Sequence, residues 1–259
     1  MTEIKRWDSA EHAKLKELYF NKKLPILQIC SMLSRTPASV NQRLSDKFKR
    51  NRALPKIKIP TNITPVLARI HAHICGDGNL FKKREKDSYG YMGCYKPNSH
   101  RYRYGIEYTN MNSLLIKEFM EDTRLIFGLK PYYLDNRVRV KSKDVCNLLK
   151  ELGAGKSHDW FISPKIMRAT KVIKKNWIKA FFDDEACFNA GGRIRVRSVN
   201  RKGLTQVMRM LNEFLPCHIT PKNNYYPDDS VYLNINKGDA AKFFSKIGSR
   251  RYSNNIIIR

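Results

Sequence analysis

Two short segments of this sequence end an apolar, helix-forming stretch on a carboxylate, and each opens the same succession of expected elements. The first segment covers residues 70–78 and carries Asp77, and the second covers residues 178–186 and carries Glu185. After each segment the apolar pattern predicts two strands, a helix, a second pair of strands and a short helix. A repeated order of elements indicates an internal duplication more strongly than either short motif does alone.

The duplication predicts an α+β fold made of two αββαββα repeats, at about residues 63–165 and 166–259. In the first repeat the strands and helices are expected, in chain order, at 79–83, 101–109, 113–128, 131–142 with a turn at Asp135-Asn136, and 144–152. In the second repeat they are expected at 186–190, 193–199, 203–215, 218–236 and 239–247. Each repeat would then carry one acidic residue at the end of its first helix.

Small residues at four-residue spacing predict that the two first helices pack closely against each other. The first of these helices, expected over residues 64–77, carries three of them: Ala68, Ala72 and Gly76. The second, expected over residues 174–185, keeps Ala180 but has Asp184 where the first has Gly76. A charged group at a close helix contact must be solvated or paired. The sequence leaves both outcomes open, together with a role for Asp184 as an accessory acid.

The charge balance favours a polyanionic partner. The sequence carries 50 Lys and Arg against 23 Asp and Glu, a formal net charge of +27, so nucleic acid is the expected ligand. No segment approaches the roughly 18 apolar residues of a membrane-spanning helix, and residues 1–7 lack the apolar core of a signal peptide. We therefore expect a cytoplasmic protein that does not bind membranes. The six cysteines form no CxxC pair, which argues against a zinc site or a disulfide framework.

Residues 1–52 are expected to form a separate domain of three helices. Asp8 and Glu11 match a capping box at the start of the first helix, and Pro37 suits the first position of a third helix over residues 37–48. The polar face of that third helix carries Ser39, Asn41, Gln42, Arg43 and Lys47. The pattern resembles a Myb-like or homeodomain-like helix-turn-helix, whose last helix would lie in the major groove. A trihelical bundle with an ordinary polar face is the alternative, and residues 53–62 are expected to form a basic linker.

Basic residues alternate with apolar residues along strands of both repeats. The first repeat has Arg137, Arg139 and Lys141, preceded by Arg101 and Arg103, and the second has Arg193, Arg195 and Arg197. Because successive side chains of a strand point to opposite faces, each sheet is expected to have one apolar and one cationic face. Single-sign faces in both repeats favour a phosphate backbone as ligand over ordinary solvation.

From about Thr61 to the C-terminus the chain resembles a single-chain LAGLIDADG (DOD-type) homing endonuclease, of the kind found in archaeal introns and inteins. The nonapeptide of that family ends in an acidic residue before a small one, which matches Asp77 before Gly78 and Glu185 before Ala186. The resemblance implies that Asp77 and Glu185 are the catalytic and metal-binding pair. It also implies a monomer whose paired sheets form a DNA-binding saddle, and a long pseudo-palindromic duplex target.

Phosphodiester hydrolysis needs an activated water and a counter-charge for the leaving oxygen, and divalent ions between two carboxylates supply both. Mg²⁺ is the expected ion, with Mn²⁺ as the alternative, since hard oxygen ligands suit it and it retains waters. Relatives in the family carry a lysine or glutamine near the end of the second strand of each half. Here Asn110 and Asn200 occupy what the sequence suggests are symmetric positions, and both are candidate DNA contacts. His71 and His73 lie two residues apart on a helix and so point to different sides, which argues against a shared metal.

Two other functions remain compatible with the sequence. A DNA-binding regulator could keep the fold without cleavage, although it would not need both Asp77 and Glu185. An RNA maturase that assists intron splicing would need the same basic concave surface, and it would differ by preferring structured intron RNA over duplex DNA. We rank the endonuclease first, the regulator second and the maturase third.

Overall fold

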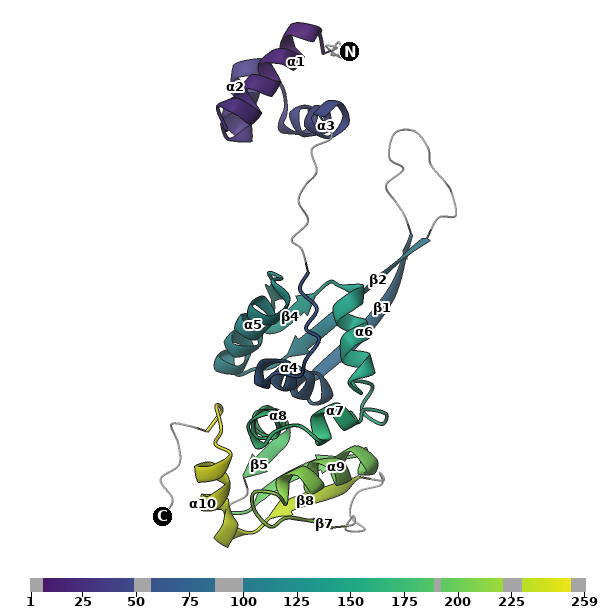
Figure 1. Cartoon of the computed structure of the whole chain (residues 1–259), viewed down its shortest axis with the longest axis vertical. Coiled ribbons are helices and arrows are strands. Elements are labelled where there is room, and N and C mark those ends of the chain that lie inside the picture. The colour runs from purple at the N-terminus through teal and green to yellow at the C-terminus, as the bar shows by residue number, and fades with distance from the viewer. Residues whose placement is uncertain (1–6, 49–56, 87–99, 189–191, 221–229, 253–259) are drawn as a thin grey trace. The chain divides into compact units, whose positions relative to one another are not determined.

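The computed structural model describes residues 7–48, 57–86, 100–188, 192–220 and 230–252 (Figure 1). The chain divides into two compact units, Met1–Lys56 and Ile57–Arg259. Each unit has its own core of buried apolar side chains. Among the described residues no helix is both long and apolar enough to cross a membrane.

The N-terminal unit is helical. Its elements are α1 (Ser9–Lys16), the π-helical turn η1 (Glu17–Asn21), α2 (Ile26–Leu33) and α3 (Pro37–Phe48). The Asp8 side chain accepts a hydrogen bond from the backbone N–H of Glu11 while the Glu11 side chain accepts one from Asp8, so the predicted capping box is present. Leu15, Ile29, Val40 and Leu44 are fully buried and hold the helices together.

The C-terminal unit begins with the first of two similar halves. Its elements are α4 (Pro65–Cys75), β1 (Gly78–Lys86), β2 (His100–Thr109), α5 (Ser113–Phe127), β3 (Tyr132–Leu134), β4 (Arg137–Val140) and α6 (Lys143–Glu151). The strands form one antiparallel sheet in the order β1-β2-β4-β3. Asp135 and Asn136 have positive φ angles of 51° and 57°, the backbone that a tight two-residue hairpin requires.

The second half repeats this order. Its elements are α7 (Pro164–Met167), α8 (Lys171–Glu185), β5 (Ala186–Phe188), β6 (Ile194–Ser198), α9 (Arg201–Leu211), β7 (His218–Thr220), β8 (Val231–Ile235) and α10 (Lys237–Lys246). The strands again form an antiparallel sheet, in the order β5-β6-β8-β7. The predicted α+β fold with two αββαββα repeats is therefore confirmed. The short α7 was not predicted, because one turn is too short to show a helical period.

Helices α4 and α8 lie side by side where the two halves meet (Figure 1). A Cβ atom built on Gly76 would lie 3.0 Å from the Cβ atom of Asp184, so the small residue permits the close approach that its spacing predicted. The Arg69 side chain contacts Asn176 nearer the start of both helices. Because these two contacts occur in the same order along both helices, α4 and α8 run parallel and their C-terminal ends meet.

The end of the first motif differs from the prediction. Helix α4 ends at Cys75 with Gly76 as its C-cap, rather than continuing to Asp77. Strand β1 then starts at Gly78, where a Cβ atom would lie only 2.4 Å from the Cα atom of Ile74. The helix therefore ends two residues earlier than predicted, and the chain turns closely into the strand. In the second half α8 continues through Glu185, and β5 follows it directly.

Candidate active site

The parallel arrangement of α4 and α8 brings Asp77 and Glu185 to the same end of the helix pair. Asp77 lies in the connection that follows α4, and its side chain is exposed. Glu185 is the last residue of α8 and is half-buried. Burial and, after it, the negative charge of Asp77 raise the pKa of Glu185, as expected for two carboxyl groups at the same end of the helix pair.

Burial and repulsion between neighbouring carboxylates disfavour the ionised forms of Asp77 and Glu185. Burial, followed by the charges of Asp77 and Asp184, raises the pKa of Glu185 to about 8. Burial and the charge of Asp184 raise the pKa of Asp77 to about 6, against the opposing effects of His73 and Arg251. A group of carboxylates that resist ionisation in the absence of a cation is suited to bind one.

The donor set suits a divalent ion that keeps part of its water shell better than a metal enclosed by protein ligands. Among the residues that the structure describes, no group of three or more His, Cys, Asp and Glu side chains is arranged to hold a metal. Asp77 and Glu185 offer two hard carboxylate ligands, and Mg²⁺ commonly takes one or two carboxylates with waters and phosphate oxygens.

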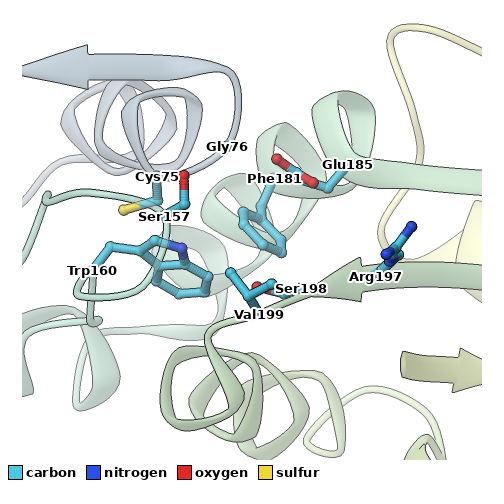
Figure 2. A pocket seen from close by; sticks show the side chains of 9 residues that line it. All are labelled: Cys75, Gly76, Ser157, Trp160, Phe181, Glu185, Arg197, Ser198 and Val199. Atoms are coloured by element: carbon cyan, nitrogen blue, oxygen red, sulfur yellow. The ribbon is translucent and has the colours of Figure 1, made fainter. Parts of the chain in front are cut away.

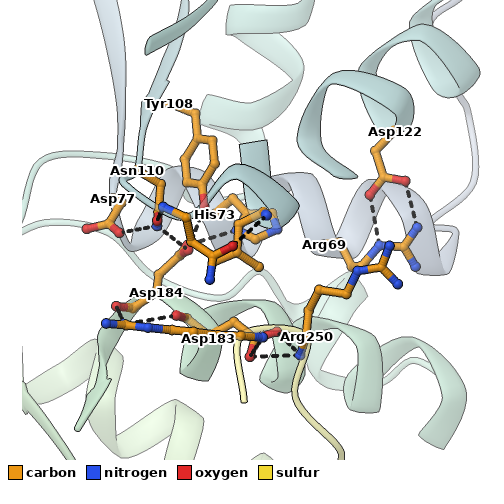
Figure 3. A network of polar contacts seen from close by, with 12 residues as sticks. Arg69, His73, Asp77, Tyr108, Asn110, Asp122, Asp183, Asp184 and Arg250 are labelled. Atoms are coloured by element: carbon orange, nitrogen blue, oxygen red, sulfur yellow. Dashed lines mark hydrogen bonds and ion pairs between the residues drawn. The ribbon is translucent and has the colours of Figure 1, made fainter. Parts of the chain in front are cut away.

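Asp184, the possible accessory acid, is a buried hydrogen-bond acceptor. Its side chain has no exposed surface. Its Oδ2 atom lies 2.8 Å from Nδ1 of His73. Its Oδ1 atom accepts hydrogen bonds from the Tyr108 hydroxyl at 2.7 Å and the Asn110 amide at 3.3 Å (Figure 3). Of the two outcomes that the sequence left open, the charge is paired rather than solvated.

Asn110 connects this buried carboxylate to the carboxylate of Asp77. Its Nδ2 atom donates to Asp77 Oδ2 at 2.8 Å as well as to Asp184 (Figure 3). Its Oδ1 atom accepts from the backbone N–H of Asn112, which caps α5. Both ends of the amide are therefore used, and Asp77 is held in one orientation from the first half.

The predicted symmetry between Asn110 and Asn200 is wrong. Gly78 pairs with Tyr108 in the first sheet and Ala186 pairs with Val196 in the second, so two residues further on Asn110 corresponds to Ser198. Asn200 instead matches the helix cap Asn112. The sequence did not reveal this correspondence because the first half has asparagine at both positions, Asn110 and Asn112, and either could be aligned with Asn200.

Asn200 is a buried helix cap rather than a surface contact. Only 4% of its surface is exposed. Its Oδ1 atom accepts from the backbone N–H of Gly203, and its Nδ2 atom donates to the carbonyl of Trp160 at 2.5 Å. A side chain committed in this way cannot contact DNA without opening the core, so Asn200 is removed from the candidate contacts.

A cavity of about 400 Å³ lies beside Glu185 (Figure 2). The rings of Trp160 and Phe181 form apolar parts of its wall, and Arg197 lies on its polar side. The Nε atom of Arg197 donates to the Ser230 hydroxyl at 3.0 Å, which orients the guanidinium. No sequence signal predicted the cavity, because its lining comes from α4, α8, β6 and a loop that are distant in the chain.

The predicted basic residues lie on or beside the exposed faces of the sheets, opposite the buried valines and isoleucines. On the first sheet these residues are Arg103, Arg137, Arg139 and Lys141, and on the second they are Arg193, Arg195 and Arg197. The Arg101 side chain lies outside the part of the chain that the structure describes. Asn234 accepts a hydrogen bond from Arg195.

The first cationic face is not single-sign, which corrects the sequence analysis. Glu107 lies directly opposite Arg139 in the sheet. Its carboxylate accepts a hydrogen bond from Arg139 Nε at 2.7 Å and lies 3.5 Å from Arg137 Nε. The corresponding position of the second sheet is occupied by Arg195. The two halves thus present different charges to a ligand.

On α3 of the N-terminal unit, some predicted DNA-contact residues are bonded within the protein and others are exposed to solvent. The Ser39 hydroxyl accepts a hydrogen bond from the Trp7 indole, and the Arg43 guanidinium lies 5.7 Å from the centre of that ring. The Asn41 amide donates to a backbone carbonyl of its own helix. Gln42 and Lys47 are exposed, and Gln42 donates to Asp46.

His71 and His73 are both fully buried and have different partners, as their spacing predicted. Trp177 of α8 donates its indole N–H to His71 Nδ1 at 2.9 Å. Burial lowers the pKa of His71 to about 4, so this ring is neutral and accepts that hydrogen bond. Burial also opposes protonation of His73, but the charge of Asp184 and its hydrogen bond outweigh burial and raise the pKa of His73.

Two four-stranded antiparallel sheets of matching strand order, with parallel α4 and α8 between the halves, constitute the fold of the LAGLIDADG homing endonucleases. This chain is similar to the solved structure of mesophilic variants of the homing endonuclease I-DmoI. The two share 21% sequence identity and superpose with a TM-score of 0.53, and the alignment covers 72% of this chain and 97% of that chain. I-DmoI in complex with DNA and Mn is 21% identical, with a TM-score of 0.52, covering 72% of this chain and 98% of that chain. No protein-family model and no curated protein matches the sequence.

Proposed function

We propose that the C-terminal unit is a site-specific, metal-dependent endonuclease for double-stranded DNA, and a LAGLIDADG homing endonuclease in which Asp77 and Glu185 hold the ion. The convergence of these two carboxylates, one from each half, at the ends of parallel α4 and α8 carries the proposal. Its solved structural neighbours include a homing endonuclease bound to DNA and Mn and a variant bound to target DNA with Mg. We propose Mg²⁺ as the ion, with Mn²⁺ as an alternative.

A bound divalent ion would polarise the scissile phosphate and supply an activated water at neutral pH. The side chains of this chain prepare the site for that step. Asn110 fixes one oxygen of Asp77, so the other remains available as a ligand. Glu185 forms no hydrogen bond with any described residue, so both of its oxygens can serve the ion. Hydrolysis then adds one water, breaks one P–O bond and leaves a phosphate and a hydroxyl at the cut.

The exposed sheet faces are the proposed DNA-binding surface of this unit. Arg139 and Lys141 on the first sheet, and Arg195 and Arg197 on the second, supply cations and hydrogen-bond donors at the spacing of alternate strand residues. Because Glu107 and Arg195 occupy equivalent positions, the two halves would read different base pairs. A long target with related but unequal half-sites follows from this difference.

We propose that the protein acts as a monomer. The polar contacts between α4 and α8 pair unlike residues, namely Arg69 with Asn176, His71 with Trp177, and His73 with Asp184. A homodimer would place two identical helices at this interface, and two copies of α4 would bring buried cationic or neutral rings together without acceptors. The single chain therefore supplies both partners.

We propose that the N-terminal unit is a helix-turn-helix whose α3 adds DNA contacts, with Gln42 and Lys47 on its exposed side. By resemblance, the biological role is the homing of an intron or intein. Both roles depend on the duplex DNA activity of the C-terminal unit and would not stand without it.

Selection from a randomised duplex library in Mg²⁺, with sequencing of bound and cleaved molecules, tests the proposal. The native protein, Asp77→Asn and Glu185→Gln would be compared. We expect both variants to bind the same sequences and to lose cleavage by at least about 100-fold, since each removes a metal ligand. Asp122→Asn is the matched control, because Asp122 is a buried carboxylate paired with Arg69 of α4 but outside the proposed metal site.

Specific binding with no cut by the native protein would contradict the endonuclease and support a regulator. Preferential selection of structured RNA over duplex DNA in a parallel library would support a maturase. Cleavage that survives both substitutions would remove Asp77 and Glu185 from the catalytic site.

A further inference from the structure

The segment that follows α10 returns to the end of α8, next to the proposed catalytic pair. Gly248 has a φ angle of +80°, and its N–H donates to the carbonyl of Phe243 at 3.1 Å. This left-handed residue ends α10 and redirects the chain. Residues 248–252, which we call the C-terminal turn, then pack against α8 and the start of β5. In the first half α6 also ends at a left-handed glycine, Gly153, whose φ angle is +104°.

A buried carboxylate holds the C-terminal turn in place. Asp183 of α8 is 1% exposed. Its Oδ1 atom accepts hydrogen bonds from the Ser249 hydroxyl at 2.5 Å and from the backbone N–H of Arg251 at 3.2 Å. Its Oδ2 atom accepts from the backbone N–H of Arg250 at 2.9 Å (Figure 3). Because several donors of the turn bond to one buried carboxylate, the backbone of the turn is held in a fixed position.

The consequence is a fixed position for the Arg251 guanidinium. Its Nη1 atom donates to the carbonyl of Asp183 at 3.3 Å and lies 3.5 Å from the carbonyl of Asp184, the two residues that precede Glu185. The guanidinium also lies 5.2 Å from the centre of the Tyr252 ring, whose hydroxyl donates to the carbonyl of Ala186. Arg251 remains exposed, and its Nε and Nη2 donors have no partner among the described residues.

Among the described residues, no cationic side chain occupies the positions where β2 and β6 end. Those positions hold the neutral side chains of Asn110 and Ser198, and Arg197 is oriented by the Ser230 hydroxyl. The positive charge of Arg251 reaches the carboxylates, since it lowers the pKa of Asp77. A planar guanidinium with unused parallel donors matches the geometry of a phosphate.

We propose that Arg251 binds the scissile phosphate at the active site, and that Asp183 is the positioning residue that holds Arg251 there. The inference rests on the proposed endonuclease function and names a phosphate ligand within it. Hydrolysis converts a phosphodiester with one negative charge into a terminal phosphate with up to two, so a nearby guanidinium stabilises the charge that develops. If Arg251 only capped the carbonyls of α8, the contacts of its Nη1 atom would be explained, but its Nε and Nη2 donors would have no role.

The test uses the full-length chain with Arg251→Ala, Arg251→Lys and the matched control Arg250→Ala, which removes a neighbouring cation of the same turn. Cleavage of the selected duplex would be measured under single-turnover conditions in Mg²⁺, and binding would be measured in Ca²⁺. We expect Arg251→Ala to slow cleavage by about 100-fold while changing duplex affinity by less than about threefold. Arg251→Lys should recover part of the rate, because it restores charge without the planar fork.

A second measurement does not depend on cleavage. Duplexes already cut at the target would be offered in Ca²⁺ with and without a terminal phosphate at the cut. We expect the native protein and Arg250→Ala to prefer the phosphorylated end by about tenfold, and Arg251→Ala to lose that preference. Asp183→Asn should lose most of the preference too, and adding Arg251→Ala to it should change little further, since both act on one contact. Thermal unfolding of each variant checks that it is folded.

Cleavage by Arg251→Ala within about threefold of native, with an unchanged phosphate preference, would overturn the inference. Equal losses in Arg250→Ala would also overturn it, because they would indicate a general effect of charge. A native protein that binds its target but never cuts would contradict the proposed function instead. The phosphate preference would then still decide whether Arg251 binds phosphate.

Discussion

His73 and Asp184, one from each half of the C-terminal unit, form a pair 2.8 Å apart in which neither side chain has any exposed surface. This pair lies where Gly76 of the first half approaches Asp184 of α8, within electrostatic range of Asp77. The Tyr108 hydroxyl and the Asn110 amide complete the shell around Asp184. The carboxylate is therefore part of the joint between the halves as well as a support for Asp77.

Replacing Asp184 should reveal how much the joint depends on its hydrogen bonds. We expect Asp184→Ala to lower the free energy of unfolding by about 3–5 kcal/mol, because it leaves buried donors without an acceptor. Asp184→Asn keeps one oxygen for Tyr108 and should cost less. Urea unfolding of both variants measures the difference. An unchanged midpoint for Asp184→Ala would mean that the pair does not hold the halves together.

The stability of the metal-free protein should fall as pH rises. The pKa values of Asp77 and Glu185 are raised to about 6 and about 8, so the folded chain binds more protons than the unfolded chain between about pH 4 and pH 8. Folding is then favoured at the acidic end of this range and loses that contribution as pH rises through the folded pKa values. His73, whose pKa is also raised, contributes in the same direction, whereas His71, whose pKa is lowered to about 4, opposes the trend below about pH 6.5.

Mg²⁺ should oppose this loss. At pH 8 the carboxylates are largely ionised and can bind the ion, whereas at pH 5 protons occupy the site, so Mg²⁺ should raise the midpoint of thermal unfolding by a few degrees more at pH 8. Glu185→Gln is the control and should show a much smaller difference. Equal effects of Mg²⁺ at both pH values would argue against a site formed by these carboxylates.

The two glycines of the first motif should differ in their tolerance of a methyl group. A Cβ atom on Gly76 would meet the Asp184 Cβ at 3.0 Å, which asks α8 to move by a few tenths of an ångström. A Cβ atom on Gly78 would meet the Ile74 Cα at 2.4 Å, where only backbone movement gives relief. We expect Gly76→Ala to cost about 1–3 kcal/mol and Gly78→Ala more. Chemical unfolding ranks them, and the reverse order would contradict the packing described.

Removing Glu107 should strengthen DNA binding. Its carboxylate holds Arg137 and Arg139, so Glu107→Gln would release two guanidinium groups toward the phosphate backbone. The slope of log affinity against log salt should become steeper by up to about 2 units. Glu121→Gln is the charge-matched control, since Glu121 is exposed on α5 and pairs only loosely with Lys117 at 4.0 Å. A similar gain in both variants would indicate net charge rather than release of these arginines.

The N-terminal unit should add phosphate contacts to those of the sheets. We expect a chain limited to residues 57–259, the second compact unit, to bind the target more weakly and with a shallower salt slope than the full chain. Fluorescence anisotropy over a range of salt concentrations measures both. A truncated chain with the native slope would show that α3 makes no phosphate contacts.

Some features of the protein could be predicted from local sequence. The apolar periods and the caps at Asp8 and Asn112 give helix positions, because they depend on residues within one or two turns. The Asp135-Asn136 turn likewise follows from the side chains that tolerate positive φ. Repetition of the whole pattern then identifies Asp77 and Glu185 as a pair.

The order of elements, the duplication and the two residues that end the motifs could therefore be read from the amino-acid pattern alone. Three relationships between residues far apart in the chain became visible only in the folded protein. Asp184 is paired with His73, Ser198 rather than Asn200 matches Asn110, and Asp183 brings Arg251 to the end of α8. The physical reason is that periodicity and caps arise from contacts between residues a few positions apart. The ion pair and the hydrogen bonds where α4 and α8 meet join residues more than 60 positions apart. Contacts over such distances produce no regular spacing that could be recognised in the sequence.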